Sequence, residues 1–341
     1  MRSTLSFAAA LLVVFAVAQA QDKLPLVKVV ATGGTIANTP SGRLHAGEVA
    51  DAIPALKKVA RLEVEEVIRV GSSSITVENW LTLARRINEI FVAEPEVKAI
   101  VVTHGSNTVE ETAYFLSLTV KSDKPVVLTA AQRQFSTLSS DSPKNFLQAV
   151  RVAASDEARG KGALVVTNDL INAARDVTKN ITYRVDTYDS KDLGALGFVD
   201  EDRVTFYRAP IRRHTTATPF DVSRLQKLPR VDIVYTYAGA DGALIDAAAA
   251  NQAEGVVIAG FPTGSGTPAM DQAMKRVAAK GIAVVMTNRG GTGRVTDTRA
   301  AEARPLVFGD TLTPQKARIL LMLALTTTKD PAQLQRIFQT Y

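Results

Sequence analysis

The chain has 341 residues, enough for one large domain or two domains of medium size. It contains no cysteine, which excludes disulfide bonds and thiolate metal sites. Lysine and arginine number 40 against 34 aspartate and glutamate, giving a formal net charge of +6. Because the basic residues are scattered and aromatic residues make up only 6% of the chain, we expect a solvated surface and no nucleic-acid partner.

Residues 1–20 have the pattern of a secretion signal peptide. Arg2 supplies the positive start, residues 5–18 form an apolar stretch, and Ala18-Gln19-Ala20 is a small-x-small cleavage site. The apolar stretch is too short to span a bilayer comfortably, which makes a retained anchor the less favoured interpretation. We therefore predict cleavage after Ala20, export from the cytoplasm and no membrane partner.

Apolar, β-branched runs alternate with helical patterns in the first part of the chain. Strands are expected at 26–32, 64–70, 98–103, 125–130 and 163–167, and helices at 77–91, 108–118 and 143–154. This alternation predicts a mainly parallel sheet, doubly wound, with helices on both faces. We assign it to a larger N-terminal α/β domain over residues 21–207.

The pattern lapses at residues 208–229, which are polar, contain proline and are interpreted as a linker. Beyond it, strands are expected at 231–237, 255–260 and 282–287, and helices at 243–252, 268–280 and 314–327. Pro314 at the first helical position, with Thr313 before it as cap, supports the start of the last long helix. Residues 230–341 are therefore predicted to form a smaller C-terminal α/β domain.

Residues 31–37, Ala-Thr-Gly-Gly-Thr-Ile-Ala, directly follow the first predicted strand. Gly33 and Gly34 allow a sharp turn and a close approach to a ligand, and Thr35 is a candidate nucleophile. The polar stretch 38–47 could close over a bound substrate. A plain strand-to-helix turn is the structural alternative. A phosphate-binding loop is disfavoured because the Walker lysine and the dinucleotide glycine spacing are both absent.

A second hydroxyl-rich turn, residues 103–108, ends another predicted strand. Ligands bind at the carboxyl ends of strands in open α/β sheets, so Ser106 and Thr35 could face one crevice. Helix capping is the structural alternative for Asn107 and Thr108. Lys179 is a candidate base if burial makes it neutral, although most lysines are simply solvated.

The histidines do not suggest a metal site. His45, His104 and His214 are far apart in the sequence, so a metal cluster is not expected. A buried, hydrogen-bonded side chain is the alternative for His104.

Three further segments follow these two motifs along the chain: Asp141–Asn145, Arg175–Lys179 and Leu312–Arg318. With these five motifs in this order, the sequence resembles the bacterial type II L-asparaginases and glutaminase-asparaginases. The similarity extends over essentially the whole mature chain. It implies a periplasmic homotetramer of two-domain subunits, with active sites between paired subunits. It also implies hydrolysis of the side-chain amide of asparagine, and sometimes glutamine, without a cofactor or metal.

The same resemblance assigns roles to four residues. Thr35 matches the threonine that attacks the amide carbon and forms an acyl-enzyme. Ser106 matches a second threonine that helps to activate the attacking oxygen together with a lysine, and Lys179 matches that lysine. Ser72 matches the serine that holds the α-carboxylate of the substrate. Backbone donors around Ser106 would stabilise the developing oxyanion.

Two departures from the family pattern affect the site for the substrate's α-ammonium group. Asn107 stands where the family has an aspartate, and Ser73 stands where it has a glutamine. Loss of a charge-assisted bond in a dry site could cost on the order of 2–5 kcal/mol. Loss of the aspartate should also lower the pKa of Lys179.

Three further departures concern the flexible loop and the neighbouring subunit. Leu44 stands where the family has a tyrosine, and the adjacent His45 is a candidate replacement in proton transfer. Thr263 stands where the neighbouring subunit contributes an asparagine. The family's glutamate has no confident match, with Ala300 and Glu302 the nearest candidates.

These observations leave three functions open. The first is ordinary hydrolysis of L-asparagine. Glutamine is longer by one methylene group, which a binding pocket discriminates by only about 1–3 kcal/mol, so it remains a possible substrate. The second is the same chemistry on a related amide without a free α-ammonium group. The third is a catalytically silent relative that binds a small ligand, which retention of Thr35, Ser106 and Lys179 opposes.

Overall fold

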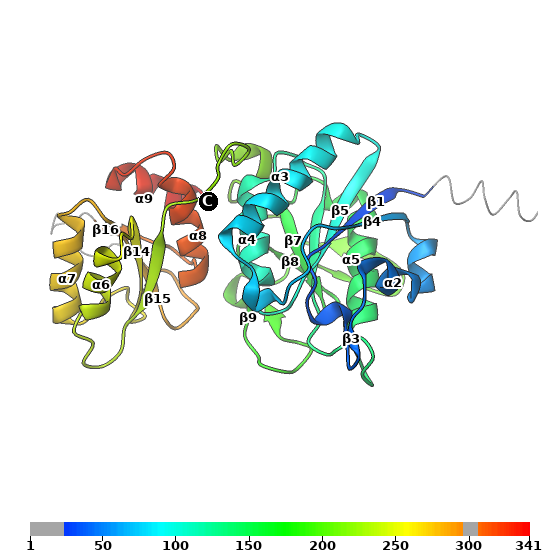
Figure 1. Cartoon of the computed structure of the whole chain (residues 1–341), viewed down its shortest axis with the longest axis horizontal. Helices are drawn as coiled ribbons and strands as arrows, with labels where there is room; N and C mark the ends of the chain where they lie inside the picture. The colour runs from blue at the N-terminus through cyan, green and yellow to red at the C-terminus, as the bar shows by residue number, and fades with distance from the viewer. Residues whose placement is uncertain (1–23, 296–305) are drawn as a thin grey trace, which may run out of the picture.

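Two β-sheets organise the protein, an eight-stranded sheet from residues 26–206 and a four-stranded sheet from residues 231–308 (Figure 1). The structure is a computed structural model that describes residues 24–295 and 306–341. The predicted signal peptide lies outside the described residues, as do Ala300 and Glu302.

The larger sheet has eight strands in the order β12-β11-β8-β7-β6-β5-β1-β4. Its strands β4, β1, β5, β6 and β7 are parallel, whereas β8, β11 and β12 extend one edge in antiparallel fashion. The bounds are β1 Leu26–Ala31, β4 Arg61–Glu66, β5 Val97–Thr103, β6 Val126–Thr129, β7 Ala163–Thr167, β8 Leu170–Ala173, β11 Gly197–Val199 and β12 Val204–Phe206.

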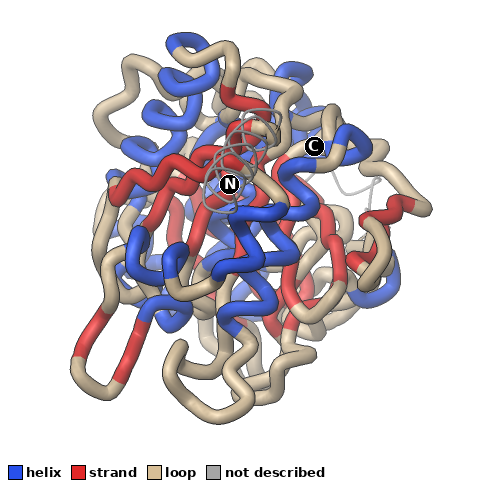
Figure 2. The backbone as a smooth tube through the Cα atoms, turned by 90° about the vertical axis from the view of Figure 1, so that its right-hand side faces the viewer, coloured by secondary structure: helices blue, strands red, loops and turns tan. Residues whose placement is uncertain are grey.

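Helices cover both faces of this sheet. Successive residues of a strand point to opposite faces, and the central strands are apolar on both, so both faces need a covering layer. Ile100 and Val102 of β5 join the hydrophobic cluster that contains α3 and α4, whereas Ala99 and Val101 join the cluster that contains α2 and α5. The view in Figure 2 shows helices on either side of the strands. The bounds are α2 Ala46–Asp51, α3 Val77–Ala93, α4 Val109–Thr119 and α5 Ser142–Ala154. The predicted doubly wound domain is confirmed.

The smaller sheet has four parallel strands in the order β13-β14-β15-β16. They are β13 Val231–Tyr235, β14 Gly255–Gly260, β15 Ala283–Asn288 and β16 Leu306–Phe308, with helices α6 Ala243–Ala250, α7 Pro268–Ala278, α8 Pro314–Ala324 and α9 Pro331–Thr340. Helices α6 and α7 share a core on one face. This arrangement confirms the predicted smaller C-terminal α/β domain.

Helix α8 connects the two domains through one continuous apolar core. Its buried side chains belong to the same hydrophobic cluster as α4 of the larger domain and β13–β15 of the smaller one. The proposed linker, residues 208–229, lies between β12 and β13 and contains a short 3-10 turn at Thr215–Ala217. Phe220 and Val222 of this segment are buried in that core, so the segment is packed rather than free in solvent.

The structure differs from expectation at two helix starts. Helix α8 does begin at Pro314, but the Thr313 hydroxyl is buried without a hydrogen-bond partner among the described residues, so it does not cap the helix. Thr108 precedes α4, yet its hydroxyl donates to the Ser72 carbonyl (2.8 Å) instead of capping.

Residues 38–47 were expected to form a flexible loop. They contain a short hairpin, β2 Asn38–Thr39 with β3 Gly42–Arg43, in which Arg43 Nε donates to Asn38 Oδ1 (3.0 Å).

In the part of the chain that the structure describes, no helix has the length and apolarity needed to cross a bilayer.

Candidate active site

Three turns meet at the carboxyl ends of β1, β4 and β5, and glycines allow the contact. A Cβ on Gly34 (φ +94°) would lie 2.2 Å from Gly105 Cα, and one on Gly105 would lie 2.6 Å from Ser72 Oγ. A Cβ on Gly33 (φ +93°) would lie 2.6 Å from the Val70 carbonyl oxygen. Side chains at these positions would force the turns apart, so glycine is required for this convergence.

The contact between Gly34 and Gly105 places the next residue of each turn at the same sheet edge. Those residues are Thr35 and Ser106, the two hydroxyl residues expected from the sequence to face one crevice. The Thr32 amide also donates to the Thr103 carbonyl (3.0 Å), which continues the β1–β5 pairing up to the turns. The structure therefore brings together the two motifs that the sequence separates by about seventy residues.

Ser106 and Lys179 form a direct hydrogen-bonded pair. Lys179 Nζ lies 2.9 Å from Ser106 Oγ and 3.4 Å from Asn107 Oδ1. Lys179 lies in a small hairpin, β9 Thr178–Lys179 with β10 Tyr188–Asp189, where it pairs with Tyr188. The Tyr188 hydroxyl in turn donates to the Ser106 carbonyl, so the hairpin holds both ends of the pair.

The environment of Lys179 makes its neutral form more accessible than that of a fully solvated lysine. Partial burial lowers the pKa of the Lys179 ammonium, while the charge of Glu110 acts in the opposite direction. A neutral amine 2.9 Å from a hydroxyl can accept the hydroxyl proton. The pair therefore has the geometry of an activated nucleophile or of a general base that acts through Ser106.

Glu110 links this pair to the C-terminal domain, a role that the sequence did not reveal. Glu110 Oε2 accepts from the Lys179 amide (2.9 Å), and Oε1 accepts from Gln315 Nε2 of α8 (2.9 Å). A glutamate in the first turn of a helix is common because it complements the helix dipole, so its position alone indicates no further role. Glu110 stands beside a second carboxylate, Glu111, in the first turn of α4, so no local pattern singles it out.

Lys316, the residue after Gln315 in α8, binds the backbone of the segment that leads into β9. Lys316 is fully buried and donates to the Arg175 carbonyl (3.0 Å) and to the Val177 carbonyl. Burial lowers the pKa of Lys316 to about 8, although Glu110 and Asp176 oppose the shift. Helix α8 thus fixes the backbone immediately before Lys179 at two points.

Ser72 closes the third side of the site. It is buried, its hydroxyl accepts from the Asn107 amide (3.1 Å), and its carbonyl accepts from Thr108 Oγ1 (2.8 Å). Ser73, in contrast, is exposed. Thr108 occupies the N-cap position of α4, but it makes no capping hydrogen bond through its side chain, and the Asn107 side chain contacts Lys179 instead.

Thr35 begins a 3-10 turn at the end of β1 and is half-buried. The turn is anchored by Ser142 Oγ, which donates to the Ile36 carbonyl (2.7 Å), and by the Ala37 amide, which donates to the Gly34 carbonyl (3.2 Å). Among the described residues, none forms a hydrogen bond with the Thr35 hydroxyl. This hydroxyl is therefore held in place by its backbone and is free to meet a substrate.

His104 is a structural residue. It is fully buried, with Nδ1 2.8 Å from the Gly105 carbonyl and Nε2 3.0 Å from Thr112 Oγ1, which also accepts from Trp80 Nε1 (2.9 Å). Since a carbonyl can only accept, the proton is assigned to Nδ1, and Thr112 donates to Nε2. Burial lowers the pKa of His104 to about 4, so it remains neutral at physiological pH.

The loop residues His45 and Leu44 make no described contact with the Ser106–Lys179 pair. The exposed His45 ring contacts Arg69 Nη1 (3.1 Å from Nε2) and Glu66 Oε2 (3.5 Å from Nδ1). Leu44 packs partly buried against the core cluster of α2 and α5. Within residues 24–295 and 306–341, no hydrogen bond joins His45 to Thr35 or Ser106.

Thr263 lies in the smaller domain after β14, where its hydroxyl is exposed and 3.1 Å from Ser265 Oγ. No described contact connects it to Lys179 or Ser106.

No three His, Cys, Asp or Glu side chains in the described ranges are grouped in a way that could hold a metal ion.

Both halves of the chain match known family models. The model described as "Asparaginase, N-terminal" matches residues 26–212, and the model described as "Glutaminase/Asparaginase C-terminal domain" matches residues 230–338. The chain belongs to the asparaginase family. The asparaginase resemblance inferred from the sequence is confirmed, and the protein is an amide hydrolase of this family.

Individual asparaginases are similar along nearly the whole chain. L-asparaginase 2 of Bacillus subtilis is 44% identical, covering 95% of this chain and 89% of its own length. A probable periplasmic L-asparaginase of Haemophilus influenzae is 39% identical, covering 95% of both chains. A solved structure, the probable cytoplasmic L-asparaginase of Campylobacter jejuni, matches with a TM-score of 0.89 and 39% identity, covering 93% and 100% of the two chains.

The Campylobacter match corrects one prediction. We inferred a periplasmic location from resemblance to exported asparaginases, together with the pattern of residues 1–20. A structure this similar comes from a protein described as cytoplasmic, while the Haemophilus relative is described as periplasmic. Family membership therefore does not place an asparaginase in the periplasm, and the prediction of that location is wrong.

Proposed function

We propose that this asparaginase hydrolyses the side-chain amide of L-asparagine through a covalent intermediate on Thr35. The observation that carries the proposal is the 2.9 Å contact between Lys179 Nζ and Ser106 Oγ. The contact between Gly34 and Gly105 brings the turn that carries Thr35 to the same sheet edge, and the Thr35 hydroxyl makes no hydrogen bond to any described residue. A hydroxyl nucleophile, a proton acceptor and a neighbouring relay group are the parts that acyl transfer requires.

In the proposed first step, the Thr35 oxygen attacks the amide carbon while its proton passes toward the Ser106–Lys179 pair. The tetrahedral intermediate then collapses, the carbon–nitrogen bond breaks, and the nitrogen leaves as ammonia after taking back that proton. In the second step, water attacks the ester, the pair accepts a proton from the water, and the Thr35 oxygen regains one. The products are aspartate and ammonia.

Backbone amides near Ser106, at the start of the eleven-residue helix α4, supply donors for the oxyanion in both steps. Preorganised donors of this kind often contribute the largest share of catalysis. Ser72 and Ser73 are proposed to bind the α-carboxylate and the backbone of the substrate.

A second candidate substrate is favoured by Asn107. Its side chain is neutral and exposed next to Lys179, so it offers no charge to an α-ammonium group. An amide whose α-amino group is absent or acylated would not need that charge. Glutamine is the other candidate substrate, because the C-terminal family model covers glutaminases as well.

Assembly into a homotetramer is part of the proposal. Thr263 is exposed in the smaller domain and makes no described contact with the Ser106–Lys179 pair of its own chain. A neighbouring subunit would bring its Thr263 to the site and close it. His45 is proposed as a proton-transfer partner only if the loop moves, since Arg69 and Glu66 hold its ring in this conformation.

Ammonia release by the purified protein tests the substrate. We would compare L-asparagine, L-glutamine, their D-forms, N-acetyl-L-asparagine and an asparagine dipeptide, with Thr35→Ala as the inactive variant. Release from L-asparagine at a low KM supports the first proposal. Release only from blocked amides supports the second, and no release from any of them contradicts both. Light scattering of the same sample measures the subunit number.

A further inference from the structure

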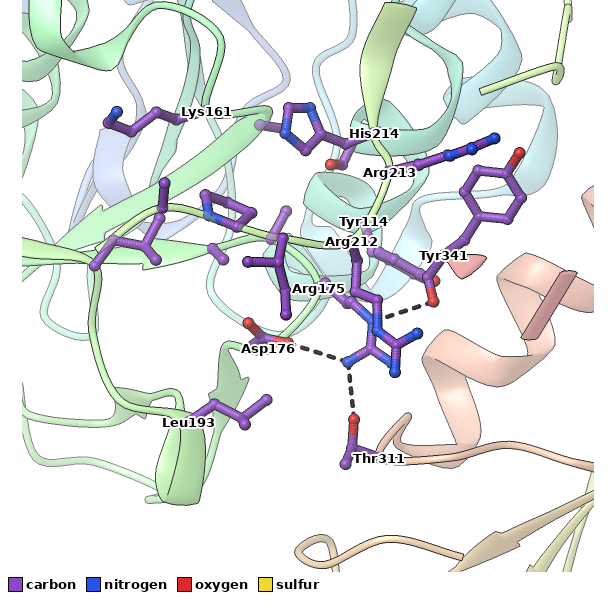
Figure 3. Close-up of a pocket in the computed structure, with 18 of the residues that line it drawn as sticks. Tyr114, Lys161, Arg175, Asp176, Leu193, Arg212, Arg213, His214, Thr311 and Tyr341 are labelled. Atoms are coloured by element: carbon purple, nitrogen blue, oxygen red, sulfur yellow. Dashed lines mark hydrogen bonds and ion pairs between the residues drawn. The ribbon is translucent and has the colours of Figure 1, made fainter. Parts of the chain in front are cut away.

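A cavity of about 460 Å³ lies away from the Ser106–Lys179 pair, between the larger domain, the segment 208–214 and the C-terminal domain (Figure 3). Neither Thr35, Ser106 nor Lys179 lines it. Its volume is within the range of small-molecule sites. Figure 3 shows that its labelled side chains come from both sides of the domain boundary.

The cavity carries an excess of positive charge. Six basic side chains line it, against two acidic ones, Asp176 and Asp310. Asp310 is shared by three guanidinium groups, at 3.4 Å from Arg175 Nη2, 2.8 Å from Arg212 Nη2 and 2.8 Å from Arg294 Nε. Arg175 Nη1 also lies 3.2 Å from Asp176 Oδ1, so two carboxylates face these three guanidinium groups. The six basic side chains of the lining still outnumber its two carboxylates, and this excess attracts a further anion.

Two polar groups at this cavity have no partner. The Tyr114 hydroxyl belongs to a side chain that is only 1% exposed, and it makes no hydrogen bond to any described residue. Burial raises the pKa of that hydroxyl, with the charges of Arg175 and Arg212 acting in the opposite direction. The Arg213 guanidinium, which is exposed at the cavity, likewise has no side-chain partner in the described ranges.

A buried hydroxyl without a partner is costly to a fold and is usually satisfied by water or by a ligand. The remaining lining includes an apolar wall of Ala163, Ala174, Leu196 and Pro210. The cavity thus offers guanidinium groups, a hydroxyl donor and a hydrophobic surface together. An inorganic anion would use the charge but would leave the apolar wall in contact with water.

We propose that this cavity is a second ligand site, which binds a small carboxylate with an apolar body. The carboxylate accepts from Arg213 and from the Tyr114 hydroxyl, and the apolar body lies on the alanine, leucine and proline wall. The site does not depend on the proposed amide hydrolysis. It can therefore be tested on protein whose activity is unknown.

Isothermal titration calorimetry with 3-phenylpropionate tests the proposal on the full-length protein. We expect binding in the millimolar range or tighter, and no binding of 3-phenyl-1-propanol, which has the same apolar body without the charge. Inorganic phosphate should bind more weakly than the carboxylate. Absence of 3-phenylpropionate binding would overturn the proposal, and so would equal affinity for the alcohol or for phosphate.

Two variants locate the site. Tyr114→Phe removes only the unpartnered hydroxyl, so it should weaken 3-phenylpropionate binding about tenfold, as loss of one hydrogen bond to a charged group does. Because no described partner is lost, its melting temperature without ligand should not fall. Arg213→Gln should weaken binding at least as much. Tyr237→Phe, a change at an exposed tyrosine of the smaller domain, is the matched control. Unchanged affinity in both cavity variants would refute the assignment.

Discussion

Replacing Asn107 with aspartate should raise the pKa of Lys179 and restore a negative charge for the substrate's α-ammonium group. Asn107 Oδ1 lies 3.4 Å from Lys179 Nζ, so an aspartate with the same side-chain direction would face the ammonium at nearly that distance. The variant therefore tests two parts of the account at once: the role of Lys179 as proton acceptor, and the weakness of the ammonium site.

The size of the effect follows from Coulomb's law. At 3.4 Å, two unit charges attract by about 5 kcal/mol at an effective dielectric constant of 20, and by about 1 kcal/mol in bulk water. Asn107 is exposed and Lys179 is only partly buried, so solvent screening places the expected value toward the lower figure. About 1.4 kcal/mol is a tenfold change in a protonation equilibrium.

The assay is the pH dependence of kcat/KM for L-asparagine. Asn107→Asp should move the acidic limb of the profile to higher pH by roughly one unit. It should also lower KM for L-asparagine by tenfold or more, with little change for N-acetyl-L-asparagine. Asn251→Asp, which adds the same charge at an exposed helix end of the smaller domain, is the control. An acidic limb that does not move would refute Lys179 as the titrating base.

Three further changes probe the framework of the site. Gly34→Ala should greatly reduce the melting temperature or prevent folding, since its Cβ would lie 2.2 Å from Gly105 Cα; a stable, active variant would contradict the close-contact argument. Gln315→Ala removes a 2.9 Å hydrogen bond to Glu110, and should lower kcat severalfold while costing about 1 kcal/mol in denaturant unfolding; an unchanged kcat would show that α8 does not position the lysine. His104, with its pKa lowered from 6.5 to about 4, should contribute stability that is present above pH 6.5 and lost as pH falls toward 4, about 3 kcal/mol in all; an imidazole NMR titration near 6.5 would contradict this.

Sequence periodicity predicted the parts of the fold that bury long apolar runs. The strands β1, β5, β6 and β7 are nearly continuous Val, Ile, Leu and Ala, and each lies within a few residues of its predicted position. Strand β4 was predicted at 64–70 but lies at Arg61–Glu66, because its charged, partly exposed sequence has no clear apolar run. The short strands β8, β11 and β12 were not predicted, since three or four residues carry too little periodicity.

The candidate site was predicted unevenly, for reasons that depend on how each residue acts. Side chains that belong to local motifs, such as Thr35, Ser106 and Lys179, could be named from the sequence. Their convergence depends on Gly34 and Gly105 in contact across the sheet, which only the fold shows. The contributions of Glu110, Gln315 and Tyr188 come from segments far apart in the chain, so no local pattern marks them.

The most direct test of the central claim is to trap the covalent intermediate. Wild-type protein would be mixed with L-asparagine, quenched in acid within milliseconds and digested, and the peptides weighed by mass spectrometry. The account predicts one aspartyl group on the peptide that contains Thr35, absent in Thr35→Ala and retained in the control Thr216→Ala, whose threonine is exposed far from the site in sequence. Ammonia release by Thr35→Ala at the wild-type rate would contradict the account.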